Sequence, residues 1–130
     1  MQQPIVISGA GILGCYISCA LSLQGIDSIV LEKKDDEVED SVRTITLNPF
    51  SKNLLDKIGI ENDYSMINKM EVKDFDGTGK IVFKSSEIGM DHLAYVSDFA
   101  TLLMAIRKKA SEKILYKEEI ININNKGDLN

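Results

Sequence analysis

Hydrophobic and polar positions at the start of the chain change from one spacing to another. Pro4–Ser8 is a short β-branched run typical of a buried strand. From Ile12 to Leu23 apolar residues recur at helical spacing, and Gly25 is placed to end that helix. Ser28–Glu32 is a second short strand. The order strand, glycine turn, helix, strand predicts a right-handed βαβ unit with parallel strands.

The pattern then becomes polar. Glu32–Asp40 is dense in acidic residues and is expected to be a solvated loop. Arg43–Leu47 is β-branched and predicts an extended segment. Asn48–Ile60 predicts a short amphipathic helix that stops at Gly59. Its apolar face would be formed by Phe50, Leu54, Leu55 and Ile58.

An antiparallel excursion is predicted next. Lys69–Ser86 contains two partly alternating runs around Asp76-Gly77, which is a strong hairpin signal. Leu93–Ser97 predicts another strand. The helix after it, about Phe99 to Ser111, would be capped by Ser97 or Asp98. Leu102, Leu103 and Ile106 would face inward, Lys113–Ile123 would form one strand or two, and residues 124–130 would be frayed.

Composition and charge limit the function classes. The 130 residues suffice for one core, and 44% hydrophobic with 27% charged residues is ordinary for a globular protein. The net charge of -5 argues against non-specific nucleic-acid binding and against attachment to anionic lipid. No apolar run is long enough to span a bilayer, and the first residues lack the basic character of a signal peptide. We therefore expect a cytoplasmic protein.

Residues that often carry chemistry are sparse. Cys15 and Cys19 lie four apart in the predicted helix and are expected to be buried structural thiols. A metal site would need more ligands, because His92 is the only histidine. His92 has no evident partner for general-base catalysis, so we name no catalytic residue and no metal ligand.

The loop after the first predicted strand carries the clearest motif. Gly9, Gly11 and Gly14 fit G-x-G-x-x-G. The first glycine allows a tight turn, the second lets a pyrophosphate approach the backbone, and the third lets the helix pack close to the sheet. The N–H groups of the first helical turn, which contains Ile12 and Leu13, would face the phosphates. The flanking strands and helix supply the context that this motif requires.

An acidic residue stands where a dinucleotide site needs one. Glu32 follows Gly14 by 18 residues and ends the second predicted strand, with Lys33 beside it. A carboxylate there can accept hydrogen bonds from a ribose, and it favours a free 2′-hydroxyl over a 2′-phosphate. FAD and NAD both satisfy this much. We therefore predict an α/β fold, a Rossmann-like βαβ FAD/NAD(P)-binding domain with an antiparallel hairpin insertion. Residues 1–130 would form a single domain.

The spacing beyond the glycines resembles the extended FAD fingerprint of glutathione-reductase-like and hydroxylase-like flavoproteins. Ser18, Leu21, Gly25 and Glu32 fall where that fingerprint has a small residue, an aliphatic residue, a glycine and a glutamate. Ser18 replaces the usual alanine, and Ser28 replaces a usual aliphatic residue. The change at Ser28 would weaken the apolar face of the second strand.

A second segment, Arg43–Ile60, resembles the aromatic-ring flavin monooxygenases of the para-hydroxybenzoate hydroxylase-like group, and most closely the ubiquinone-biosynthesis hydroxylases. The matching positions are Arg43, Leu47, Ser51, Leu55, Ile58 and Gly59. The resemblance implies that Arg43 lies beside the FAD. The alternative is that Arg43 pairs with the acidic loop. The chain departs from the family at Ala100, where an arginine or glutamine is usual.

The resemblance implies the FAD-binding portion of a flavin-dependent monooxygenase that hydroxylates an aromatic substrate, a polyprenylated phenol of the ubiquinone pathway. NAD(P)H would reduce the FAD of the complete enzyme. The family's later motifs are absent, so the resemblance implies that residues 1–130 form a single, partial FAD-binding domain with an incomplete Rossmann-like fold. This chain is expected to be inactive without a C-terminal part. A non-catalytic dinucleotide-binding remnant and an NAD-binding oxidoreductase fragment stay open. A homodimer, a separate C-terminal half and a peripheral association with the inner membrane also stay open as partners.

Overall fold

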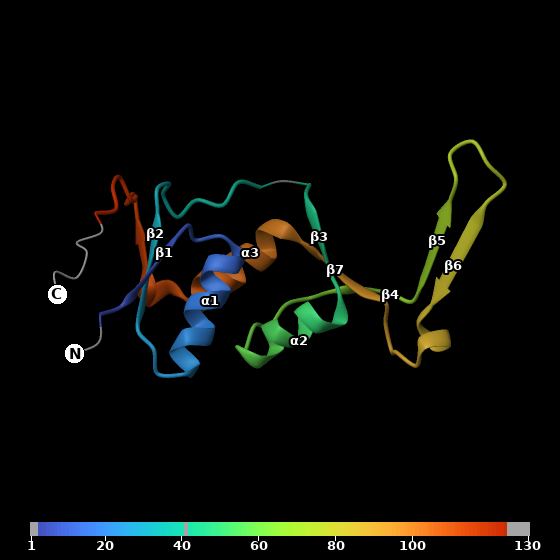
Figure 1. Cartoon of the computed structure of the whole chain (residues 1–130), viewed down its shortest axis with the longest axis horizontal. Coiled ribbons are helices and arrows are strands. Elements are labelled where there is room, and N and C mark those ends of the chain that lie inside the picture. The colour runs from blue at the N-terminus through green and yellow to red at the C-terminus, as the bar shows by residue number, and fades with distance from the viewer. Residues whose placement is uncertain (1–2, 41, 125–130) are drawn as a thin grey trace, which may run out of the picture. The chain divides into compact units, whose positions relative to one another are not determined.

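In the computed structural model of the chain, the described residues are 3–40 and 42–124 (Figure 1). They form two compact units, residues 3–38 with 106–124, and residues 39–40 with 42–105. We call these the first and the second unit and describe each by itself.

The first unit is a parallel sheet with a helix packed on it. The strands β1 (Ile5–Ser8), β2 (Ser28–Glu32) and β8 (Ile114–Tyr116) lie in the order β1-β2-β8. Helix α1 (Ile12–Leu23) connects β1 to β2 and packs on both (Figure 1). A 3-10 helix, η2 (Ser111–Lys113), precedes β8. The predicted βαβ unit is confirmed.

The buried face of α1 is made of small residues. Cys15 and Ser18 have no exposed surface and Cys19 is 9% exposed, whereas Leu13 and Leu23 are largely exposed. Small side chains let the helix lie close to the sheet. Both cysteines are buried free thiols, as the sequence predicts.

One face of this sheet is exposed to solvent on both of its edge strands, β1 and β8. By strand alternation Val6 and Leu115 lie on the face turned away from buried Val30, and both side chains are about half exposed. Parallel sheets are normally covered on both faces. The first unit is therefore an incomplete α/β layer structure.

The second unit contains an antiparallel sheet of β3 (Thr44–Leu47), β7 (Ala94–Asp98) and β4 (Ser65–Ile67), in the order β3-β7-β4. Helix α2 (Pro49–Lys57) begins after Asn48, whose side chain accepts a hydrogen bond from the Ser51 N–H at 2.7 Å. Helix α3 (Phe99–Lys109) contains the boundary between the units. Asp98 caps it, since its Oδ2 accepts the Thr101 N–H at 2.8 Å.

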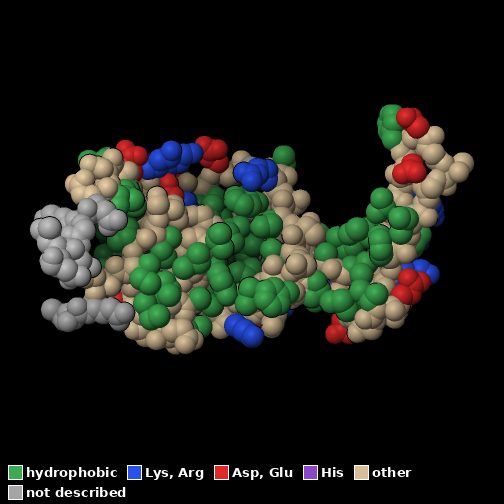
Figure 2. Space-filling model, in the orientation of Figure 1, with side chains coloured by type: hydrophobic (Ala, Val, Ile, Leu, Met, Phe, Trp, Pro, Cys, Tyr) green, Lys and Arg blue, Asp and Glu red, His purple; other side chains and the backbone are tan. Residues whose placement is uncertain are grey.

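A two-stranded ribbon completes the second unit. The strands β5 (Lys69–Lys73) and β6 (Lys80–Lys84) pair antiparallel and lead into the 3-10 helix η1 (Ser85–Ile88). The predicted hairpin is confirmed. Cross-strand pairing places four apolar residues on one face, each between 41% and 58% exposed: Met70, Val72, Ile81 and Phe83. Hydrophobic side chains gather over this ribbon in Figure 2.

Four details differ from the sequence expectation. Phe50 is 69% exposed, because it lies at the edge of a stripe whose centre is Leu55 and Ile58. In 113–123 only Ile114–Tyr116 is a strand. It ends where Lys117 adopts φ 59°, and the N–H of Lys117 turns back to the Lys34 carbonyl. Helix α3 ends at Lys109, and β4 was not predicted.

No helix in residues 3–40 and 42–124 is long and apolar enough to cross a membrane.

Candidate dinucleotide-binding site

The glycine loop leaves β1 through a backbone conformation that glycine adopts without strain. Gly9 has φ +100°, in the left-handed region. Its N–H donates to the Leu31 carbonyl at 2.7 Å, so the loop is still tied to β2 at this point. This is the tight turn that the motif predicts.

The other two glycines meet opposite surroundings. A Cβ at Gly14 would lie 2.1 Å from the carbonyl oxygen of Gly9, so the helix passes too close to the loop for any side chain. A Cβ at Gly11 would have no neighbouring atom within 4 Å. Gly14 therefore serves packing, whereas Gly11 borders open space.

The start of α1 is available to an anion. Gly11 is the N-cap residue, no side chain caps the helix, and its first turn contains no acidic residue. The first N–H groups of a helix have no acceptor within the helix, and the helix dipole favours negative charge there. Ile12 and Leu13, predicted as contacts, belong to this first turn. The geometry suits a phosphate group approaching over Gly11.

Glu32 lies at the end of β2 and is bonded to the loop. Its Oε2 accepts the Ala10 N–H at 2.9 Å, and its Oε1 accepts the Lys34 N–H at 3.0 Å. Burial alone would raise the pKa of Glu32, but these two hydrogen bonds and the nearby Arg107 charge outweigh it and hold the pKa below its ordinary value. Glu32 is therefore a carboxylate at neutral pH. Lys33 follows it and is exposed.

Arg107, on α3, is a site residue that the sequence did not reveal. Its Nε donates to the Ala10 carbonyl at 2.8 Å, and its Nη2 lies 3.8 Å from Glu32 Oε2. The only signal in the sequence is a basic last turn, Arg107-Lys108-Lys109, which is common at helix ends. Nothing in that run distinguishes the first residue from the other two.

Arg43 belongs to the second unit. Its guanidinium carbon lies 4.4 Å from the centre of the Phe99 ring, and its carbonyl accepts the Phe99 N–H at 2.9 Å. Ala100, the predicted departure from the family, is buried at 5% exposure. Contact between Arg43 and FAD stays a prediction.

The remaining candidates have structural surroundings. His92 Nδ1 is 2.6 Å from Asn68 Oδ1, and its ring meets the Tyr95 ring edge-on. Burial raises the pKa of Cys15 to about 11, so its thiol stays protonated at neutral pH. Neither residue is arranged for proton transfer or nucleophilic attack.

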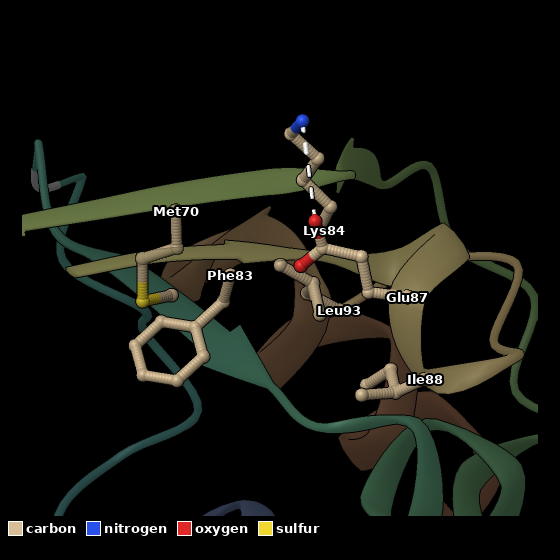
Figure 3. Close-up of a pocket in the computed structure, with 6 residues that line it drawn as sticks. All are labelled: Met70, Phe83, Lys84, Glu87, Ile88 and Leu93. Carbon is tan, nitrogen blue, oxygen red and sulfur yellow. Dashed lines mark ion pairs between the residues drawn. The ribbon is translucent and has the colours of Figure 1, made fainter.

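The second unit contains a hollow beside the β5–β6 ribbon. It has a volume of about 240 Å³, and Figure 3 shows Met70 and Phe83 from the ribbon facing Ile88. Lys84 and Glu87 form an ion pair of 4.0 Å at its rim. The volume is below the range of about 300–1,000 Å³ usual for ligand pockets, and none of the predicted site residues lines it.

The first unit thus offers what the ADP end of a dinucleotide needs. It has open space at Gly11, an uncapped helix start, and an ionised Glu32 within the same loop region. These residues fit FAD. Its pyrophosphate would lie over Gly11 at the start of α1, and its ribose would lie at Glu32.

Comparison with known proteins agrees with this fit. Residues 2–126 match the family described as "FAD binding domain". Ubiquinone biosynthesis monooxygenase COQ6, mitochondrial, of Danio rerio is 26% identical over 137 residues, covering 90% of this chain and 28% of that protein.

Solved structures of flavoproteins share the fold. The p-nitrophenol 4-monooxygenase PnpA of Pseudomonas putida DLL-E4 superposes with a TM-score of 0.74 at 17% identity, over 95% of this chain and 34% of that one. Klebsiella pneumoniae HpxO, solved with FAD and uric acid, gives 0.69 at 18% identity, over 92% and 32%. The chain therefore spans about a third or less of these proteins, and it belongs to the FAD-binding-domain family.

Proposed function

We propose that this chain is the FAD-binding portion of a flavin-dependent monooxygenase that hydroxylates an aromatic substrate, and that it holds the ADP end of the cofactor. The observation that carries the proposal is the hydrogen bond between Glu32 Oε2 and the Ala10 N–H. It fixes a ribose-binding carboxylate to the same loop that presents open space at Gly11. Both units would then be parts of a single, partial FAD-binding domain.

Each site residue has a defined task in this proposal. The N–H groups of Ile12 and Leu13 would bind the pyrophosphate, and Glu32 would accept the ribose hydroxyls. Gly9 and Gly14 shape the loop, and the exposed Lys33 lies at the rim. By the resemblance of its segment to the flavin hydroxylases, Arg43 is also proposed to contact the cofactor.

When bound, FAD supplies the redox chemistry of oxygen insertion, and the protein contributes binding and orientation. NAD(P)H would reduce the flavin in the complete enzyme. For this chain the substrate class is a polyprenylated phenol. That choice is supported by the similarity to a ubiquinone biosynthesis monooxygenase and by the Arg43–Ile60 pattern. We also propose a cytoplasmic location, and the lipid-tailed substrates of the resembled hydroxylases suggest a peripheral association with the inner membrane.

Activity would require a C-terminal part, in the same chain or in a partner. Two surfaces support this. The first unit has an open sheet face at Val6 and Leu115, and the ribbon of the second unit has an exposed apolar face around Phe83. The relatives are about three times as long as this chain, which leaves ample sequence to cover such surfaces.

FAD binding by the purified chain tests the proposal. Equilibrium dialysis and flavin fluorescence should show saturable binding, which Gly11→Val and Glu32→Ala should both remove. Gly11→Val fills the open space, and Glu32→Ala removes the ribose acceptor. No binding at high micromolar FAD would make the chain a remnant, and a preference for NAD over FAD would overturn the cofactor.

A further inference from the structure

We propose that Arg107 is a positioning residue of the dinucleotide site, which holds the ribose-binding carboxylate of Glu32 and the glycine-loop carbonyl of Ala10 in one fixed arrangement. This inference rests on the proposed FAD-binding function and assigns it a residue from a distant part of the chain.

Ala10 is held on both sides of its backbone. Its N–H donates to Glu32 Oε2 at 2.9 Å, and its carbonyl accepts the Arg107 Nε–H at 2.8 Å. Ala10 has no exposed surface and stands between Gly9 and Gly11. Glycine loops have few conformational restraints of their own. These two bonds therefore tie the middle of the loop to β2 and to α3.

The contact between Arg107 and Glu32 leaves the carboxylate free to accept more hydrogen bonds. The Nη2 to Oε2 distance is 3.8 Å, which is an ion pair without a direct hydrogen bond. Each carboxylate oxygen has received one backbone N–H, and a carboxylate offers about four acceptor sites. Capacity for two ribose hydroxyls remains, and the guanidinium charge offsets the burial of the acid.

The surroundings of Arg107 favour arginine over lysine. Both Arg107 and Glu32 side chains are only 13% exposed, and the guanidinium carbon lies 5.7 Å from the centre of the Tyr116 ring. Tyr116 pairs with Glu32 across β2 and β8. A planar guanidinium can donate to Ala10 with one nitrogen while another faces Glu32, whereas an ammonium group is a single point charge.

We expect replacement of Arg107 to weaken the binding of ligands that carry the ribose 2′-hydroxyl more than the binding of ligands that lack it. A general loss of packing would weaken both equally. The probes are ADP and 2′-deoxy-ADP, whose affinities for the whole chain are measured by calorimetry. The wild type should prefer ADP by about tenfold, the value of one hydrogen bond to a charged group. Arg107→Met should bind ADP about tenfold more weakly and lose most of that preference.

Two further variants sharpen the test. Lys108→Met removes a charge from the same helical turn at an exposed position and should stay within about twofold of wild type for both ligands. Arg107→Lys keeps the charge, and it provides a second test if Arg107→Met does not fold. It should recover part of the affinity for ADP but not the full preference for ADP over 2′-deoxy-ADP. Urea unfolding of each variant shows that it is folded at the assay temperature.

Three results would overturn the inference. If Arg107→Met and Arg107→Lys keep both the affinity and the preference of wild type, Arg107 has no positioning role, although the proposed function stands. An equal weakening of ADP and 2′-deoxy-ADP in both variants would reduce Arg107 to a structural residue. Wild type that binds neither ADP nor FAD would remove the proposed function and this inference together.

Discussion

The hydroxyl oxygens of Ser18 and Ser28 lie 2.8 Å apart in the interior of the first unit, one on α1 and the other at the start of β2. Both residues are at most 1% exposed. Each replaces a residue without a hydroxyl in the FAD fingerprint, and each alone would bury an unsatisfied polar group. Together they form a hydrogen bond across the helix–sheet interface.

This pairing predicts strong coupling between the two positions. Ser18→Ala and Ser28→Ala should each lower the free energy of unfolding by about 1–3 kcal/mol, because the partner hydroxyl is left buried. The double variant should lose clearly less than the sum, which urea denaturation measures. The exposed Ser86→Ala should change little. Additive losses would show that the two hydroxyls do not stabilise each other.

Replacement by alanine should destabilise the protein strongly at Gly14 and only slightly at Gly11. Gly14→Ala places a Cβ 2.1 Å from a backbone oxygen, so we expect a loss of about 3 kcal/mol or an unfolded protein. Gly11→Ala enters open space at an extended backbone position and should cost less than about 1 kcal/mol. Thermal melts of the two variants give the comparison. Equal destabilisation would contradict the geometry of the loop.

The lowered pKa of Glu32 predicts how the free energy of unfolding depends on pH. Its folded-state pKa lies below the ordinary value of 4.5, so its contribution is fully present above that pH. It is lost as the pH falls from 4.5 through the lower folded-state pKa. Glu32→Gln should therefore be less stable than wild type at neutral pH, and the two should converge in acid. Urea unfolding from about pH 7 to 3 measures the difference. A constant difference between the proteins would contradict the prediction.

The apolar face of the β5–β6 ribbon should bind a hydrophobic dye and promote self-association. Isolated two-stranded ribbons are marginal in water, and four half-exposed apolar residues lie on one side of this one. The double variant Ile81→Thr/Phe83→Thr should reduce dye fluorescence and shift sedimentation toward the monomer. Val82→Thr, on the opposite face, should not. A cooperative melt of a monomer that binds no dye would contradict this expectation for the wild type.

Local patterns predicted the geometry of the glycine loop better than the long-range contacts that hold it in place. Gly9, Gly14 and Glu32 lie within one βαβ unit, so the spacing of residues along the chain sets their geometry. Arg107 reaches Ala10 from 97 residues away, and no short pattern reports such a contact.

The sequence also does not show when a polar residue at one buried position is compensated by a polar residue at another. Ser28 reads as a weak point in an apolar strand until Ser18 is placed beside it. The three-residue strand β4 has too few positions to show alternation, and it forms because β7 offers an edge. Phe50 fits an amphipathic pattern but lies at the margin of the buried stripe. These features depend on which elements become neighbours.

Competition for bound FAD tests most directly the claim that this chain holds the ADP end of the cofactor. FAD bound to the purified chain is titrated with ADP and, separately, with FMN, and free flavin is measured by equilibrium dialysis. We expect ADP to displace FAD and FMN not to displace it, since the contacts proposed for the glycine loop, the start of α1 and Glu32 are all with the phosphate and ribose of the ADP half. Displacement by FMN with no effect of ADP would contradict it, as would the absence of FAD binding.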